Sequence, residues 1–220
     1  MKLKRIRWLI PVIILLLAVI FSGFTDHKTV LTGQMICERG DPATFYLRAL
    51  DADGELKASG TGFCITEDGM ALTAAHVIKG ADAVHAVLPD GKEITVTVVS
   101  SDSKTDVAVL RLPKGAYPHL ELETEIPVKG EPAYALGYPT RTAKIVSDGV
   151  VSMPVASING TERLLLSAEL ASGMSGGPVL CEHGFVIGLN AATLRTMNGV
   201  STSPTTQQLI DAVAAAKKAK

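Results

Sequence analysis

Several short segments in the first half of the chain either alternate between hydrophobic and polar residues or run continuously apolar, and both patterns are typical of β-strands. These patterns predict strands at residues 44–50, 60–66, 70–73, 83–88, 93–100 and 107–112. Asp-Gly pairs at 53–54, 68–69 and 90–91 separate several of these segments and favour tight turns. The first half of the chain is therefore expected to fold as a unit of short strands.

The second half begins after a stretch of different composition. Residues 113–129 are rich in proline, glycine and charge, which predicts a connection, and a second β unit is expected from 131 to about 204. Beyond it, apolar side chains recur at the spacing of a helix, and lysines complement the negative helix end. The apolar positions are Leu209, Ile210, Val213 and Ala214. A C-terminal helix is predicted over residues 205–218.

The N-terminal 24 residues combine a basic flank with an apolar stretch. The basic residues are Lys2, Lys4, Arg5 and Arg7. Residues 8–24 carry no charge and would span about 25 Å as a helix, so the chain after Asp26 is expected to be translocated. We favour a retained signal anchor, because residues 21–25 fit a small-residue cleavage site poorly, and a cleaved signal peptide is the alternative. Residues 25–42 are interpreted as a polar spacer.

Composition narrows the range of functions. With 47% hydrophobic residues the chain can bury a substantial core. A net charge of −1 and an aromatic content of 5% differ from the basic, aromatic-rich surfaces of nucleic-acid binders, so no nucleic acid is expected as a partner. No metal site is expected either, because Cys181 and His183 lack a second ligand pair at zinc-type spacing. No glycine-rich phosphate loop is found.

Three short segments contain residues suited to nucleophilic catalysis. They are 73–77 (TAAHV), 105–110 (TDVAVL) and 172–178 (SGMSGGP). A serine hydroxyl is a poor nucleophile at neutral pH, so Ser175 needs an imidazole to take its proton, and His76 needs a carboxylate to fix its tautomer. Asp106 opens an apolar run and can supply that carboxylate. His76, Asp106 and Ser175 are therefore the candidate catalytic residues.

The residues around Ser175 strengthen this interpretation. Glycines on both sides permit a tight turn that aims backbone N–H groups at a developing oxyanion. Gly173 and Ser175 are the expected donors, and Met174 lies between them in the same oxyanion-binding segment. The competing interpretations are a surface turn that happens to contain a serine, a structural histidine and an acid at a strand end. The three segments together favour the catalytic interpretation.

The sequence resembles the HtrA-like branch of the chymotrypsin-fold serine proteases over roughly residues 44–218. Besides the three catalytic segments, the resemblance rests on 60–65 (GTGFCI), 135–139 (ALGYP) and 147–152 (SDGVVS). It implies an all-β fold of two six-stranded antiparallel barrels with the active site between them. The expected protease domain covers 43–220. Its parts are barrel one at 43–112, a connection at 113–130, barrel two at 131–204 and the C-terminal helix.

The sequence departs from the family pattern at two points. The residue before the nucleophile is Asp in trypsin-like zymogens and usually Asn in HtrA-like enzymes, whereas here it is Met174. We therefore expect no activation through a newly cleaved, buried N-terminus. HtrA-like enzymes also usually continue into PDZ domains, and residues 205–220 have room for one helix. The resemblance therefore implies a form of the fold without a PDZ domain.

The resemblance also points to a substrate pocket. Its wall is expected from Glu169, Leu170 and Ala171 before the nucleophile, and from a strand that contains Asn190, Ala191 and Ala192. Leu170 matches the apolar position that limits pocket depth, which predicts acceptance of small or medium aliphatic side chains. Glu169 lies six residues before Ser175, where trypsin-like enzymes have the acid that selects Lys or Arg. A solvated Glu169 is the favoured alternative, because burying an unpaired carboxylate is costly.

The odd number of cysteines permits one intramolecular disulfide at most. Cys64 falls in a predicted buried strand, and Cys37 with Cys181 is the pair that we favour.

The expected function is a serine endopeptidase that needs no cofactor, acts on unfolded or extracytoplasmic polypeptides and is attached to the membrane through residues 8–24. The alternative is an inactive protease-fold module that binds partners at the membrane. Oligomerisation is possible in this family, but no sequence feature supports it.

Overall fold

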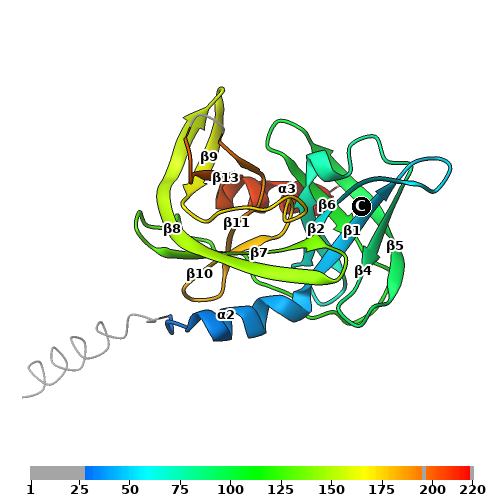
Figure 1. Cartoon of the computed structure of the whole chain (residues 1–220), viewed down its shortest axis with the longest axis horizontal. Helices are drawn as coiled ribbons and strands as arrows, with labels where there is room; N and C mark the ends of the chain where they lie inside the picture. Colours follow the sequence, from blue (N-terminus) through cyan, green and yellow to red (C-terminus); the bar gives the residue numbers. More distant parts are fainter. Residues whose placement is uncertain (1–27, 195–196, 219–220) are drawn as a thin grey trace, which may run out of the picture. The chain divides into compact units, whose positions relative to one another are not determined.

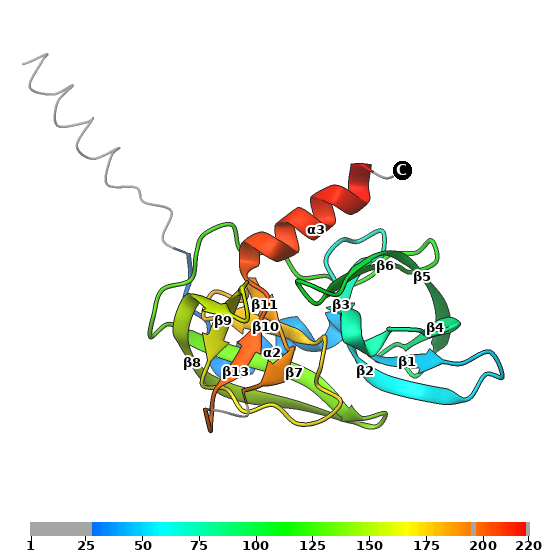
Figure 2. The same cartoon turned by 90° about the horizontal axis from the view of Figure 1, so that it is seen from above.

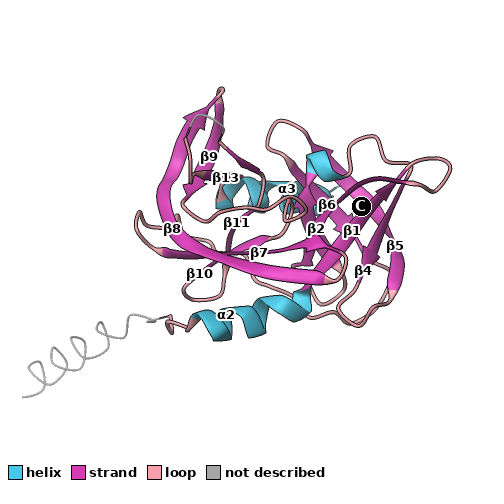
Figure 3. Ribbon diagram, viewed as in Figure 1, coloured by secondary structure: helices cyan, strands magenta, loops and turns pink. Residues whose placement is uncertain are grey.

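The computed structural model describes residues 28–194 and 197–218. The chain divides into two units, Met1–Val30 and Leu31–Lys220, and every helix and strand that the structure describes belongs to the second. This unit contains two β-sheets, shown in Figures 1 and 3. The predicted anchor at residues 8–24 lies outside the described residues. Within the described ranges, none of the helices has the length and apolar character needed to cross a membrane.

The first sheet is a closed barrel of six antiparallel strands in the order β1-β2-β3-β6-β5-β4. This confirms the first predicted barrel, although β2 begins at Leu56 rather than at residue 60. The strands are β1 (Thr44–Leu50), β2 (Leu56–Cys64), β3 (Met70–Ala74), β4 (Ala83–Val87), β5 (Glu93–Asp102) and β6 (Val107–Arg111).

Apolar segments and turn chemistry account for the barrel. Almost every residue of β1 is buried, and Phe45 and Leu47 belong to the main core. The turns at Gly54, Gly69 and Gly91 have φ angles of 83°, 88° and 85°, a region that glycine enters without steric cost. The Asp-Gly pairs therefore mark real turns, as predicted.

The second sheet has seven strands in the order β11-β10-β7-β8-β9-β13-β12. Figure 1 shows the long strand β8 curving along this sheet. β8 pairs with β7 through its first part and with β9 through its last. The strands are β7 (Pro132–Thr140), β8 (Ala143–Ile158), β9 (Thr161–Leu166), β10 (Pro178–Cys181), β11 (Val186–Leu189), β12 (Ala192–Thr193) and β13 (Ser201–Ser203).

This sheet differs from the second six-stranded barrel that was predicted, because within the described residues no ladder joins its end strands β11 and β12. β11 and β12 follow each other directly along the chain, but β11 pairs with β10 whereas β12 pairs with β13. Asn190 exchanges backbone hydrogen bonds with Gly176 and Gly177 just before β10, whereas the Ala191 amide donates to the Thr202 carbonyl in β13. The two ends of the sheet therefore meet at residues 189–192, but no continuous hydrogen-bond ladder closes the sheet into a barrel.

A helix that the sequence analysis did not predict lies within the stretch interpreted as a spacer. α2 (Gly33–Gly40) starts at Thr32, whose side chain accepts a hydrogen bond from the Met35 amide, and runs into the 3₁₀ turn η1 (Asp41–Ala43). Ile36 of α2 is completely buried in the main core. The helix was missed because it is short and contains few apolar residues, so it depends on tertiary packing.

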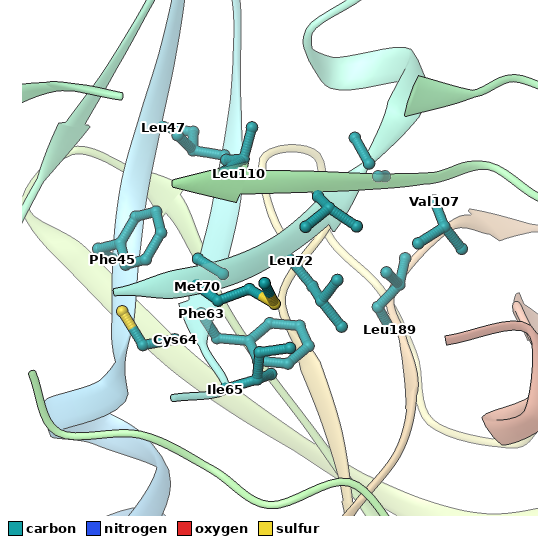
Figure 4. Packing of buried hydrophobic residues seen from close by; sticks show 14 of the residues in the cluster. Phe45, Leu47, Phe63, Cys64, Ile65, Met70, Leu72, Val107, Leu110 and Leu189 are labelled. Carbon is teal, nitrogen blue, oxygen red and sulfur yellow. The ribbon is translucent and has the colours of Figure 1, made fainter. Parts of the chain in front are cut away.

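The main core joins both sheets and the C-terminal helix. Leu189 of β11 belongs to the same buried cluster as Val107 of β6 (Figure 4). α3 (Thr206–Lys218) confirms the predicted helix and packs against β5, β6 and β11, as Figure 2 shows. Its buried face includes Leu209 and Val213, whereas Ala214 is exposed, so the packed stripe is slightly rotated from the predicted one.

Candidate active site

Ser175 lies in a tight turn between β9 and β10. Gly173 and Gly176 in this turn have φ angles of 88° and 85°. A Cβ atom at Gly173 would lie 2.5 Å from the Tyr138 carbonyl oxygen, and one at Gly176 would lie 2.2 Å from Thr73 Oγ1. Both positions combine a left-handed backbone with close packing, so the turn requires glycine on either side of Met174 and Ser175.

Two backbone amides of this turn have no acceptor among the residues that the structure describes. Within the described residues, neither the Gly173 amide nor the Ser175 amide donates a hydrogen bond, whereas the Met174 amide donates to the Ala171 carbonyl oxygen at 3.1 Å. The structure thus leaves the two predicted oxyanion donors free. Met174, which was predicted for the same segment, has its amide engaged.

The Met174 side chain is completely buried beneath the turn. It packs against Ala135 and Ala168, and its sulfur accepts a hydrogen bond from the Ala171 amide at 3.3 Å. A flexible thioether fills such a space without bringing a charge into it. The departure from the Asp or Asn of related proteases is therefore accommodated by packing.

His76 lies in the one-turn 3₁₀ helix η2 (Ala75–Val77) directly after β3 and contacts Asp106 before β6. His76 Nδ1 lies 2.8 Å from Asp106 Oδ2, and the His76 amide donates to Asp106 Oδ1 at 2.9 Å. An ionised carboxylate can only accept hydrogen bonds, so Nδ1 carries the proton and Nε2 is left as a proton acceptor. The His76 side chain remains 46% exposed, so that nitrogen is accessible.

Asp106 has an unusual backbone for a non-glycine residue, with a φ angle of 64°. Aspartate tolerates this left-handed region better than most residues, but it still costs about 1 kcal/mol. The Asp106 carbonyl also accepts from the Ala75 amide at 3.2 Å. Backbone and side chain together hold η2 and the Asp106 loop as one unit.

Strand β2 brings Ser175 close to His76. A Cβ atom at Gly60 would lie 2.7 Å from Val77, the neighbour of His76, and 2.9 Å from the Ser175 carbonyl oxygen. The Thr61 amide donates to that carbonyl at 2.8 Å. Both candidate catalytic segments therefore abut the same two residues of β2.

The Ser175 hydroxyl donates to the Ala191 carbonyl oxygen at 3.5 Å, at the long limit of a hydrogen bond. Within the described residues, no hydrogen bond joins it to His76. Catalytic hydrogen bonds in enzymes without substrate are often long or misaligned and shorten in the complex.

Thr61 is the residue that ties the two sheets together at this site. Its buried hydroxyl donates to the Gly173 carbonyl oxygen at 2.9 Å and accepts from the Tyr138 amide at 2.8 Å. The sequence analysis quoted Thr61 only as part of a motif. Its position between two strand glycines, which often mark a close backbone approach, was the available signal.

Thr61→Val is expected to lower the free energy of unfolding by about 2–4 kcal/mol, because it leaves one buried N–H and one C=O without a partner. Thr95→Val is the matched control, since Thr95 is exposed and makes one 3.4 Å contact with His85. It is expected to change stability by less than about 0.5 kcal/mol. Urea unfolding of both variants measures the difference, and equal small effects would contradict this role for Thr61.

The six residues predicted for the substrate pocket differ in their surroundings. Glu169, Ala171 and Ala192 are exposed, and Leu170 is half-buried against Met174 and its neighbours. The two others, Asn190 and Ala191, are buried.

Asn190 holds the Ser175 turn through its side chain as well as its backbone. Its Nδ2 donates to the Leu136 carbonyl at 2.8 Å and to the Met174 carbonyl at 3.2 Å. The sequence analysis assigned Asn190 to the pocket wall and missed this contact, which depends on tertiary packing.

The favoured disulfide between Cys37 and Cys181 was wrong, because both are free thiols, as is Cys64. Cys181 is completely buried in the small core of the second sheet, whereas Cys37 is partly exposed on α2. Burial, with Asp41 nearby, raises the pKa of Cys37, and burial raises the pKa of Cys64 to about 12. The three thiols occupy separate environments, and burial raises the pKa of Cys181 as well, which disfavours the nucleophilic thiolate at all three positions.

A closed barrel packed against a second antiparallel sheet, with a His–Asp pair on the first and a glycine-bounded serine turn on the second, defines the chymotrypsin-like class of folds. Residues 60–189 match the trypsin-like peptidase domain family. The chain belongs to this family.

The similar proteins agree with that assignment. A probable periplasmic serine endoprotease, DegP-like, of Halomonas elongata is 35% identical over 153 residues, which cover 66% of this chain and 31% of that protein. The corresponding protein of Chlamydia trachomatis is 33% identical over 145 residues, covering 64% of this chain and 29% of that protein. The resemblance to HtrA-like proteases is thereby confirmed. The chain spans about a third of the length of these relatives.

A solved structure supports the fold independently. The crystal structure of the serine endoprotease from Yersinia pestis superposes with a TM-score of 0.75 at 22% sequence identity. The match covers 86% of this chain and 68% of that chain.

Proposed function

We propose that the chain is a serine endopeptidase in which Ser175, His76 and Asp106 form the catalytic triad. The observation that carries the proposal is the pairing of the His76 ring and amide with the two carboxylate oxygens of Asp106, at 2.8 and 2.9 Å, beside the Ser175 turn. A binding module has no chemical need for this arrangement. The relatives named as serine endoproteases support the same activity.

The proposed reaction uses each group at a defined step. Ser175 Oγ attacks the carbonyl carbon of the scissile peptide bond while His76 Nε2 takes the hydroxyl proton. Asp106 accepts from Nδ1 and stabilises the imidazolium that forms. The free amides of Gly173 and Ser175 donate to the developing oxyanion. His76 then gives its proton to the leaving amine, and water hydrolyses the acyl-enzyme by the same route in reverse.

The proposed organisation places the catalytic domain at residues 43–220, outside the cytoplasm, with an anchor or signal peptide at 1–24. The basic flank before residues 8–24 supports translocation, and the relatives are named as periplasmic. Attachment through 8–24 is the arrangement that we favour, and release after cleavage is the alternative. Residues 25–42 include α2, which packs on the domain.

Incubation of the full chain with a reduced, carboxymethylated protein tests the proposal. An endopeptidase generates new amino termini that increase linearly with time and with enzyme concentration. An inactive, protease-fold module binds the unfolded protein and generates none. Unfolded polypeptide is the proposed substrate class because cleavage requires an extended segment in the active site.

The residue on the acyl side of the scissile bond is expected to be Val, Ala or Leu. Glu169 is exposed, which favours a solvated carboxylate over a specificity residue, and Leu170 is the apolar group beside the turn. Mass spectrometry of a cleaved peptide library reads the preference, and Glu169→Gln should leave it unchanged. Glu67→Gln, which removes another exposed carboxylate, is the matched control. Dominant cleavage after Lys or Arg that Glu169→Gln alone reduces would overturn the aliphatic assignment.

A further inference from the structure

Arg163 of β9 reaches from the second sheet to the loop of the barrel that carries Asp106. Its Nη1 donates to the Thr105 carbonyl oxygen at 2.5 Å, and its Nη2 donates to the Lys104 carbonyl oxygen at 3.0 Å. Within the described residues, no other group donates to these two carbonyls. The forked guanidinium therefore binds the peptide groups that directly precede Asp106.

The loop itself is a tight, internally bonded turn. Asp102 Oδ1 accepts from the Lys104 amide and Oδ2 from the Thr105 hydroxyl, both at 2.8 Å. The Asp106 amide donates back to the Asp102 carbonyl at 2.9 Å. The Lys104 amide, together with the Thr105 hydroxyl, holds the pKa of Asp102 below its usual value. These bonds shape the turn, but none of them reaches outside it.

The positive charge of Arg163 also attracts its guanidinium to the loop that carries Asp106, as its hydrogen bonds do. Burial lowers the pKa of Arg163, and the attraction of the guanidinium to Asp106 and Asp102 opposes that shift. A guanidinium in a protein remains protonated at neutral pH. A partly buried cation thus faces the carboxylate-bearing side of the loop.

We infer that Arg163 is a positioning residue for the catalytic acid: it fixes the loop in which Asp106 adopts its left-handed backbone and so aims the carboxylate at His76. The inference rests on the proposed function. Arg163 complements Thr61, because Thr61 of the barrel holds the Ser175 turn of the second sheet, while Arg163 of the second sheet holds the Asp106 loop of the barrel. Hydrogen bonds from each sheet therefore hold the part of the proposed triad that the other sheet carries.

The effect of Arg163 is predicted to depend on Asp106. In the wild-type background, Arg163→Met is expected to slow the phosphonylation of Ser175 by a fluorophosphonate, which releases fluoride, about 10- to 100-fold, because small displacements of catalytic groups cost rates of this size. Arg163→Lys keeps the charge but loses the fork, so an intermediate rate is expected. For peptide hydrolysis, kcat should fall while KM stays unchanged, since Arg163 acts through Asp106.

The deciding measurement is the rate at which a fluorophosphonate phosphonylates the full chain, compared in a double-mutant cycle. In an Asp106→Asn background, where the acid is already lost, Arg163→Met should change the rate by less than about twofold. Arg39→Met is the matched control, since Arg39 also donates to a turn carbonyl, that of His183, but from α2. It should leave the rate unchanged.

An equal loss in both backgrounds would show a general structural role and overturn the inference, and so would an unchanged rate in the wild-type background. If Arg163→Met does not fold, Arg163→Lys carries the same comparison. A wild-type chain that does not react at Ser175 would instead overturn the proposed function, and the inference with it. The two failures are therefore distinguishable.

Discussion

Ser175→Ala is expected to lower the rate at which the chain hydrolyses an unfolded protein by about 10⁴-fold or more, and His76→Ala should have an effect of similar size. The residues of a triad act as a unit, so loss of the nucleophile or of the base removes most of the benefit of the others. The residual activity, about 10³–10⁴-fold above the uncatalysed rate, would come from the oxyanion donors and from binding.

The measurement compares initial rates of new amino-terminus formation at equal concentrations of folded protein. Ser157→Ala, which removes an exposed hydroxyl on β8, is the control and should retain the parent rate. A Ser175→Ala variant as active as the parent would show that the proposed mechanism is wrong.

Gly173→Ala is expected to slow the acylation of Ser175 by a peptide or ester substrate by about 10²- to 10³-fold, the usual effect of losing an oxyanion donor. An alanine Cβ at this position would lie 2.5 Å from the Tyr138 carbonyl oxygen and 2.8 Å from that of Pro139, both of them backbone atoms that yield little. The turn must therefore shift, and the Gly173 and Ser175 amides move with it.

Gly91→Ala separates this displacement from simple backbone strain. Gly91 has nearly the same φ angle, 85° against 88°, but a Cβ atom there meets nothing within 4 Å. It should cost about 1–2 kcal/mol of stability and leave the acylation rate unchanged. Stopped-flow acylation and urea unfolding of both variants supply the comparison. Equal rates in the two folded variants would contradict the role of the Gly173 turn.

Local signals in the sequence predicted the elements whose cause is local. The Asp-Gly pairs mark turns with positive φ, alternating or continuously apolar segments mark the strands of the barrel, and Leu209 and Val213 mark the buried face of α3. The three motifs predicted His76 beside Asp106, and the structure brings these two residues into contact.

What the sequence could not reveal depends on contacts between distant segments. α2 is stabilised by the burial of Ile36 in the core rather than by its own pattern. The backbone of Asn190 bonds to Gly176 and Gly177, whereas that of the next residue, Ala191, bonds to Thr202 in β13. This switch brings together segments that are distant in sequence. The contacts of Arg163 lie on another sheet, and no spacing rule connects residue 163 with residues 104 and 105. The disulfide prediction failed for the same reason, because pairing depends on where each thiol is packed.

At Met174, apolar packing takes the place of the ion pair that cleaved trypsin-like zymogens form at the residue before the serine. In a trypsin-like zymogen the residue before the nucleophile is an acid that a new N-terminal amine engages. Here that residue is completely buried, beside Ala135 and Ala168, and its sulfur accepts a hydrogen bond from the Ala171 amide. The turn is thus supported from below by an apolar side chain.

Reaction with a fluorophosphonate, followed by mass spectrometry of the intact chain and of its peptides, tests the proposed triad most directly, because the reagent requires an activated serine and donors for the phosphonyl oxygen. We predict a single adduct on Ser175, absent from Ser175→Ala and formed far more slowly by His76→Ala. No adduct on the folded wild-type chain, or an adduct on another residue, would contradict the proposed active site.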